Sequence, residues 1–354
     1  MDVRAEAGAQ TSALEAFGYK QELKRSLKVI DLFAYGLVMI SPIAPIAVFG
    51  FVFNASRGMV PLTYALGLVA MLFTAWSYIA MARAFPMAGS VYAYANRSMG
   101  EVAGFIAGWA ILLDYLLVPA LMYLISAVAL QAAIPIVPRW AWLAILLAIT
   151  ATANMYGVES TTKVSMVMLA LDLIFLVVLM AICFSGVAQH VNGAEVTLAP
   201  LYNPATFSPA LIFGALSIAA LSFLGFDAIS TLAEEAEGGG KAIGKATMLS
   251  LSVAALLFVG QTYVISLFLP GVTSLPEGDA TDQASYMIGA ALGGASLKAL
   301  VSVMGGAFAN LPSALTSQAA TSRLLFGMAR DGKLPKFLAF ISPKRRVQIG
   351  RAHV

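Results

Sequence analysis

Three aspartates stand inside long apolar stretches of this sequence, where a charged side chain is costly. They are Asp114, Asp172 and Asp227. A carboxylate at the centre of a membrane costs ~2.5–3.5 kcal/mol, so three would cost roughly 7–10 kcal/mol if they met only lipid. Acids in such places indicate chemistry, because a carboxylate can pair with an ammonium group or exchange a proton. The alternative for each acid is structural: it caps a helix end or bonds a neighbouring hydroxyl.

Two of the apolar stretches are interrupted near their middle, at 41–45 and at 223–227. Two prolines within one turn remove two backbone donors and clash with preceding carbonyls, so a continuous helix is not expected at the first. Interrupted helices at membrane depth are tolerated where the freed backbone groups meet protein or a water-filled cavity. Paired breaks indicate the solute site of a transporter. The candidate solute-binding residues are Ser41, Pro42, Ile43, Ala44 and Pro45 in the first break and Phe223, Gly225, Phe226 and Asp227 in the second.

The composition of the chain indicates its class. Of its 354 residues, 60% are hydrophobic and 11% are charged, against roughly a quarter charged in a soluble domain. A soluble protein of this length could not cover so much apolar surface, so the sequence predicts an all-α polytopic membrane protein. The stretches 189–208 and 270–296 carry Pro, Gly, Asn and acidic residues and are predicted to be loops. A window of about 20 residues predicts about eight spans, namely 29–53, 60–83, 101–131, 139–157, 162–188, 209–232, 245–269 and 297–325.

Several kinds of chemistry find no support in the sequence. Cys183 is the only cysteine, and the only histidines, His190 and His353, fall outside the spans. The chain has no HExxH motif, no P-loop and no glycine-rich dinucleotide fingerprint. We therefore expect no enzyme, no cofactor, no metal and no nucleic-acid partner. The expected partners are a small solute and the lipid bilayer.

The basic residues predict the orientation of the chain. With the N-terminus inside, 18 basic residues lie on the inner side, which fixes the topology by the positive-inside rule. Residues 1–28 are polar and end in cations, so they predict a cytoplasmic tail rather than a secretory signal. The loop 189–208 is then extracellular and 326–354 is a cytoplasmic segment, in a protein of the bacterial inner membrane. The basic residues predicted outside are Arg57, Arg139 and Lys298.

The two breaks divide the predicted spans into five and three. A repeat of five helices that opens with a broken helix would pair one break with the other. Residues 29–188 are then a first repeat, and 209–325 contain three helices of an incomplete second repeat. We expect at least two further helices in the complete protein. Residues 349–354 match the translation of a sequencing adapter, so we expect this end to be a library artefact.

A series of short motifs resembles the amino acid–polyamine–organocation permeases. They occur in that family's order, from about the first span to the end of the chain. The resemblance implies the inverted five-helix-repeat (LeuT-like) transporter fold with twelve helices, of which four would be missing here. The motifs are Phe85–Tyr92 (FPMAGSVY), Gly108-Trp109 with Leu113–Tyr115 (LDY), Asn154–Val158 (NMYGV), Ser222–Asp227 (SFLGFD), Glu234-Glu235, Ser322–Leu324 (SRL) and Met328–Pro335 (MARDGKLP).

The first break departs from the usual pattern of that family. Amino acid members place a glycine-rich stretch there, whose backbone N–H groups bind the substrate carboxylate, whereas Pro42 and Pro45 offer no N–H. Asp227, directly after the second break, can pair with an ammonium group. Both features favour a cationic amine over a zwitterion, and the run 225–235 resembles the putrescine-importer branch. Asp172 falls where some proton-coupled relatives place a lysine.

These observations predict a secondary active transporter that imports a small cationic amine, putrescine-like, or an amino acid. Asp227 would pair with the ammonium group. Phe223 and Phe226 would flank it, unless these rings only pack in the core. Asp114 or Asp172 would carry the coupled proton, because burial disfavours the charged form of a carboxylate.

Two alternatives stay open. Asn310, Pro312, Thr316 and Ser317 could hold a sodium ion opposite the first break, although hydroxyls in membrane helices more often bond their own backbone. The chain could instead be a non-transporting membrane sensor or an assembly subunit on the same scaffold. The sequence leaves the oligomeric state undetermined.

Overall fold

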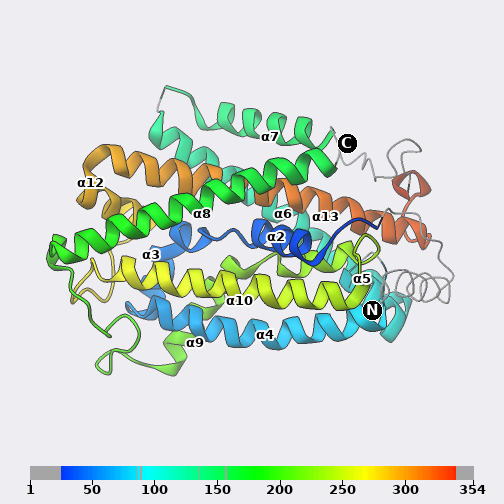
Figure 1. Ribbon diagram of the computed structural model, residues 1–354, viewed down its shortest axis with the longest axis horizontal. Helices are drawn as coiled ribbons and strands as arrows, with labels where there is room; N and C mark the ends of the chain where they lie inside the picture. Colours follow the sequence, from blue (N-terminus) through cyan, green and yellow to red (C-terminus); the bar gives the residue numbers. More distant parts are fainter. Residues whose placement is uncertain (1–24, 86, 88–89, 135, 156–157, 340–354) are drawn as a thin grey trace.

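The computed structural model describes residues 25–85, 87, 90–134, 136–155 and 158–339, which form a bundle of helices (Figure 1). Those residues include no β-strand, and the isolated β-type contact among them is a parallel bridge between Leu27 and Ala236. The all-α prediction is confirmed. Parts of several predictions lie outside the described residues, namely the tail up to residue 24, motif residues 86, 88–89 and 156–157, and the end from residue 340.

Most helices of the described residues are joined by short connections, with 3₁₀ turns and one π-helical turn among them, and the longer connections are 194–208 and 267–278. The 3₁₀ and π segments are η1 (Val191–Gly193), η2 (Ala220–Phe223), η3 (Phe226–Leu232), the π-helical η4 (Met304–Phe308) and η5 (Lys336–Ala339). The α-helices are α2 (Val29–Ile40), α3 (Ala44–Ser56), α4 (Val60–Ala84), α5 (Ser90–Met99), α6 (Glu101–Ala133), α7 (Arg139–Met155), α8 (Val158–Ala188), α9 (Pro209–Ala219), α10 (Gly239–Ser266), α11 (Asp279–Asp282), α12 (Ala284–Val303) and α13 (Asn310–Arg330).

Six helical segments in the described residues are long and apolar enough to cross a membrane, and the bent pair of α2 and α3 makes up to seven. The helix α7 is apolar over Arg139–Thr152 but shorter than these. Each predicted span coincides with an apolar helix or helix pair, while the number of crossings stays a prediction. Phe73, Trp76 and Leu256 on outer faces are 68–73% exposed, as expected of a surface that meets lipid.

Two segments differ from the prediction. The stretch 270–296, predicted as a loop, contains α11 and the first part of α12. The latter helix kinks at Gly293 and Gly294, and Gly294 has a φ of 66°. α13 ends at Arg330, five residues beyond the predicted end of the last span at 325. Short helices among Pro, Gly and acidic residues lack the long apolar run by which a span is predicted.

The first broken helix and η3, the second half of the other one, lie in the interior of the bundle. α2 lies beside α10, α13 and α8 (Figure 1). Leu32 and residues 34–40 of α2 are buried, and so is every residue of η3. Protein therefore encloses most of the interrupted backbone, which is the condition under which irregular backbone is stable at membrane depth.

Candidate functional site

The first predicted break is present but shorter than expected. α2 ends at Ile40 and α3 begins at Ala44, with a bend of 46° between them. Only 41–43 lie outside the helices, because Pro45 stands in the first turn of α3, where a proline is tolerated. Ser41 has a φ of 58°, a left-handed value that few residues other than glycine adopt.

Neighbouring side chains bind the carbonyl groups at this break. Pro42 has no N–H to offer to Val38 O, which instead accepts a 2.7 Å hydrogen bond from Ser313 Oγ of α13. The carbonyl of Pro42 accepts a 2.8 Å hydrogen bond from Gln261 Nε2 of α10. Protein atoms therefore satisfy the interrupted backbone.

The second break contacts the first. Leu224 and Gly225 separate η2 from η3, while Phe223 and Asp227 belong to these short helices. Gly225 has a φ of 98°, and a Cβ placed on it would lie 3.0 Å from Cβ and 3.1 Å from O of Met39 in α2. Glycine suits both this conformation and this close approach. The interrupted parts of the two helices therefore lie side by side.

Asp227 is buried at the start of η3, with 7% of its surface exposed. The Tyr115 hydroxyl of α6 donates a 2.6 Å hydrogen bond to Asp227 Oδ2. Thr321 Oγ1 of α13 donates in turn to the carbonyl of Tyr115 at 3.1 Å. The carboxylate therefore sits where η3, α6 and α13 meet, and it can bind a cationic group there.

The two phenylalanines of the second break lie in different surroundings. Phe226 packs edge-on against Tyr78 of α4, with 5.7 Å between ring centroids. Tyr78 also interacts electrostatically with the carboxylate of η3. Phe223 is fully buried against Tyr64 and Phe258, at centroid distances of 6.0 and 5.2 Å. Phe226 thus adds an aromatic surface near the acid, whereas the position of Phe223 favours the packing alternative.

The structure brings Asp114 to this cluster, and it places Asp172 on another helix. Asp114, partly buried on α6, interacts electrostatically with Asp227 and with Tyr78. Asp172 on α8 is 2% exposed, and its Oδ1 has no hydrogen-bond partner among the described residues. Buried apolar residues three and four positions away share its face of α8.

Two of the four residues considered as sodium ligands bond backbone carbonyls of α13 or of the η4 turn before it. Thr316 Oγ1 donates to two carbonyls of the preceding turn, at 2.8 and 3.1 Å. The Asn310 amide donates to the carbonyl of Gly306. Ser317 Oγ is buried without a partner in the described part of the chain. Thr316 and Asn310 thus follow the structural alternative.

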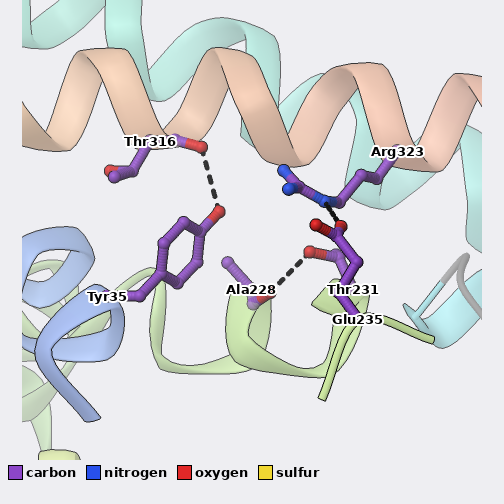
Figure 2. A network of polar contacts seen from close by, with 6 residues as sticks. All are labelled: Tyr35, Ala228, Thr231, Glu235, Thr316 and Arg323. Atoms are coloured by element: carbon purple, nitrogen blue, oxygen red, sulfur yellow. Dashed lines mark hydrogen bonds and ion pairs between the residues drawn. The ribbon is translucent and has the colours of Figure 1, made fainter. Parts of the chain in front are cut away.

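An ion-pair network joins the segment after η3 to α13, and we call this part of the bundle the Arg323 end (Figure 2). Arg323 Nε and Glu235 Oε1 are 2.6 Å apart, and their side chains are 4% and 16% exposed. Arg330 pairs with Glu234 at 2.9 Å. In the same view, the hydroxyl of Tyr35 in α2 donates to a carbonyl of α13 at 3.1 Å. The network therefore holds both broken helices against α13.

Sequence reasoning gave these ion pairs no role. The sequence nevertheless contains a feature that could have indicated them: two acids and two arginines stand close to the ends of predicted spans. Charges in such places require partners. Opposite charges in the motifs around 234–235 and 323–330 could have been paired on that ground.

The residues before α2 join the Arg323 end through backbone hydrogen bonds. The N–H groups of Ser26 and Leu27 both donate to Glu235 O at 3.1 Å. The N–H of Glu237 donates to Leu27 O at 2.8 Å. The start of α2 is therefore fixed to the chain that follows η3, so the two broken helices are joined here as well as at Gly225.

The segment 275–285 covers the opposite end of the bundle, which we call the Asn54 end. Asn54 of α3 pairs with Leu275 through both groups of its amide, at 2.6 Å (Leu275 N to Oδ1) and 3.1 Å (Nδ2 to Leu275 O). Ser285 Oγ donates to Ile46 O at 3.0 Å. A cavity of about 640 Å³ lies here among α3, α6 and α12, and it is lined by none of the predicted site residues. Protein contacts thus cover the broken helices at both ends.

Comparison with known proteins finds relatives that cover most of the chain. A family model described as amino acid permease matches residues 33–349. The low-affinity putrescine importer PlaP of Escherichia coli (strain K12) is 31% identical over 330 residues, which cover 92% of this chain and 71% of the importer. The branched-chain amino acid permease BcaP of Bacillus subtilis (strain 168) is 26% identical, with 92% and 72% covered. The methylthioribose transporter of the same organism is 26% identical, with 93% and 72% covered.

These matches, the apolar spans and the paired broken helices all indicate a membrane transporter. A permease family and transporter relatives indicate a transporter rather than an enzyme. The apolar helices indicate an integral membrane protein. The chain therefore belongs to the amino acid permease family, within the amino acid–polyamine–organocation superfamily of membrane transporters.

Proposed function

We propose that this protein is a secondary active transporter that imports a small cationic amine of the putrescine class, or an amino acid, with its N-terminus in the cytoplasm. The observation that carries the proposal is Asp227, a buried carboxylate beside two touching breaks. Pro42 and Pro45 remove N–H groups that a substrate carboxylate would need, so an ammonium group is the better fit. Similarity to a putrescine importer supports this class of solute.

In the proposed mechanism the ammonium group of the solute pairs with Asp227. Tyr115 keeps the carboxylate oriented through its 2.6 Å hydrogen bond. Phe226 and Tyr78 offer aromatic rings to the cation, a contact worth ~0.5–2 kcal/mol. Alternate opening of the Arg323 end and the Asn54 end would expose the site to one side of the membrane and then to the other.

A proton gradient is the proposed driving force, with Asp114 and Asp172 as candidate carriers. Because Asp114 interacts electrostatically with Asp227, a cation bound at Asp227 changes the affinity of Asp114 for a proton. Asp172 has a buried oxygen without a partner in the described residues, so a proton can bind there without breaking a hydrogen bond. Sodium coupling is the alternative.

Expression of the full-length gene in a bacterial strain without putrescine uptake should restore uptake of labelled putrescine. Unlabelled putrescine should compete most strongly, lysine less and a neutral amino acid least, because Asp227 attracts cations. The strain with empty vector is the control. Competition led by the neutral amino acid would contradict the amine selectivity. Absence of uptake at normal membrane abundance would favour the sensor or assembly-subunit alternative.

A protonophore should reduce this uptake to the level of the empty vector, because the proposed driving force is the proton gradient. Replacement of sodium by potassium in the medium is the control and should leave uptake unchanged. The measurement is the initial rate of labelled putrescine entry. Uptake that survives the protonophore and depends on sodium would make sodium the coupling ion.

A further inference from the structure

Two buried polar atoms at the first break have no hydrogen-bond partner among the described residues. They are Ser41 Oγ and Gln261 Oε1, and their residues are 5% and 1% exposed. Buried polar groups are nearly always paired, so such atoms indicate a water or ligand that completes them. The two atoms belong to one neighbourhood, because Gln261 contacts Pro42, the residue next to Ser41.

The hydrogen bonds of Gln261 fix the orientation of its amide. Nε2 donates to Pro42 O at 2.8 Å and to Leu257 O at 3.1 Å. Both partners are carbonyl oxygens, which only accept, so the nitrogen must face them. Oε1 therefore occupies the other branch of the amide, where it can only accept. A ligand at this position must bring a hydrogen-bond donor.

The backbone at Ser41 is strained. A φ of 58° is unfavourable for a residue with a Cβ, and such strain gathers at ligand sites. The conformation holds a hydroxyl inside the break, where a glycine would be easier to accommodate. The Ser41 hydroxyl can accept a hydrogen bond as well as donate one.

Asp227 and Ser41 lie on opposite sides of the contact between Gly225 and Met39. Gly36, three residues before Met39, packs against the side chain of Ile229, two residues after Asp227, whereas Ser41 follows Met39 by two residues. A short alkyl chain with a hydrogen-bond donor at each end is the kind of ligand that can contact both residues.

We propose that Ser41 Oγ and Gln261 Oε1 form a second subsite, which accepts hydrogen bonds from the far ammonium group of a diamine. The inference rests on the proposed function, in which Asp227 binds the first ammonium group. A monoamine leaves the second subsite without a donor, and a zwitterion brings a carboxylate towards the acceptor Oε1. The pair therefore selects solutes by the group at their far end.

Calorimetric titration of the purified full-length protein with putrescine and with butylamine tests this subsite. Wild-type protein should bind putrescine about tenfold tighter than butylamine, because a charge-assisted hydrogen bond is missing for the monoamine. In Ser41→Gly and in Gln261→Met, putrescine should bind about tenfold more weakly and butylamine as before. The dissociation constant of butylamine divided by that of putrescine therefore falls from about ten toward one. Glycine suits the φ at position 41, so that variant removes the hydroxyl without adding strain.

Thr262→Val is the matched control, because the Thr262 hydroxyl donates to Phe258 O within α10 at 2.6 Å. In this variant the ratio of the butylamine to the putrescine dissociation constant should equal that of the wild type. An unchanged ratio in both test variants would overturn the proposal and assign the two atoms to a buried water. If Gln261→Met weakened the binding of both amines equally, the proposal would also be overturned. The role of Gln261 would then be to hold the carbonyl of Pro42 in place. A wild type that binds neither amine contradicts the proposed function itself, whereas equal binding of both contradicts only the second subsite.

Discussion

Uptake of labelled putrescine is expected to fall to background when Asp227 is replaced by asparagine. The variant keeps a side-chain oxygen for the Tyr115 hydroxyl, so the shape of the site is preserved. It removes the negative charge with which the ammonium group is proposed to pair. Loss of one partner from a buried charge pair costs ~2–5 kcal/mol, which is roughly 30-fold to several thousand-fold in affinity. The measurement is the initial uptake rate at equal abundance of wild type and variant in the membrane.

Asp282→Asn is the matched control for this experiment. Asp282 is exposed at the Asn54 end and is not part of the proposed site. The same loss of charge there should leave the uptake rate near that of the wild type. Normal uptake by Asp227→Asn would remove this aspartate from the solute site.

Replacement of Arg323 by alanine should destabilise the whole protein. The variant leaves Glu235 at the Arg323 end without the partner that lies 2.6 Å away in the wild type. Removal of one member of a buried ion pair costs about 3–5 kcal/mol, because a charge is left desolvated and unpaired. The apparent melting temperature of the detergent-solubilised protein should fall by several degrees, and its abundance in the membrane should fall with it.

Two further variants show whether the ion pair causes this loss. The double variant Arg323→Met with Glu235→Gln removes both charges and should recover a large part of the stability. Lys333→Ala removes a cation whose partner, Glu101, is exposed, so solvent screens that pair and the melting temperature should change little. A melting temperature for Arg323→Ala equal to that of the wild type would show that the pair contributes nothing to stability.

The interruptions of the two helices could be predicted because their causes are local. Pro42 lacks the N–H that a helix requires, and this holds in any fold. The same rule explains why the first break is shorter than predicted, since Pro45 is compatible with the first turn of α3. Gly225 marked the second break for a related reason, because the positive φ observed there favours glycine.

The partners of the buried charges could not be predicted in the same way. Tyr115 and Asp227 are separated by 112 residues in the sequence, and Arg323 and Glu235 by 88. No periodicity links such positions, because helix packing alone brings them together. The same limit applies to Phe223, whose place in the core depends on aromatic rings from two other helices. Local chemistry thus predicted which residues were unusual, and packing determined what they contact.

The hydrogen bonds that Ser26 and Leu27 make with Glu235 have a mechanical consequence. They run from main chain to main chain, so this connection does not depend on the rotamer of any side chain. They join two segments that are more than 200 residues apart in the sequence, at the parallel bridge between Leu27 and Ala236. We therefore expect a displacement of residues 25–28 to be transmitted to the segment that carries Glu235, eight residues beyond Asp227.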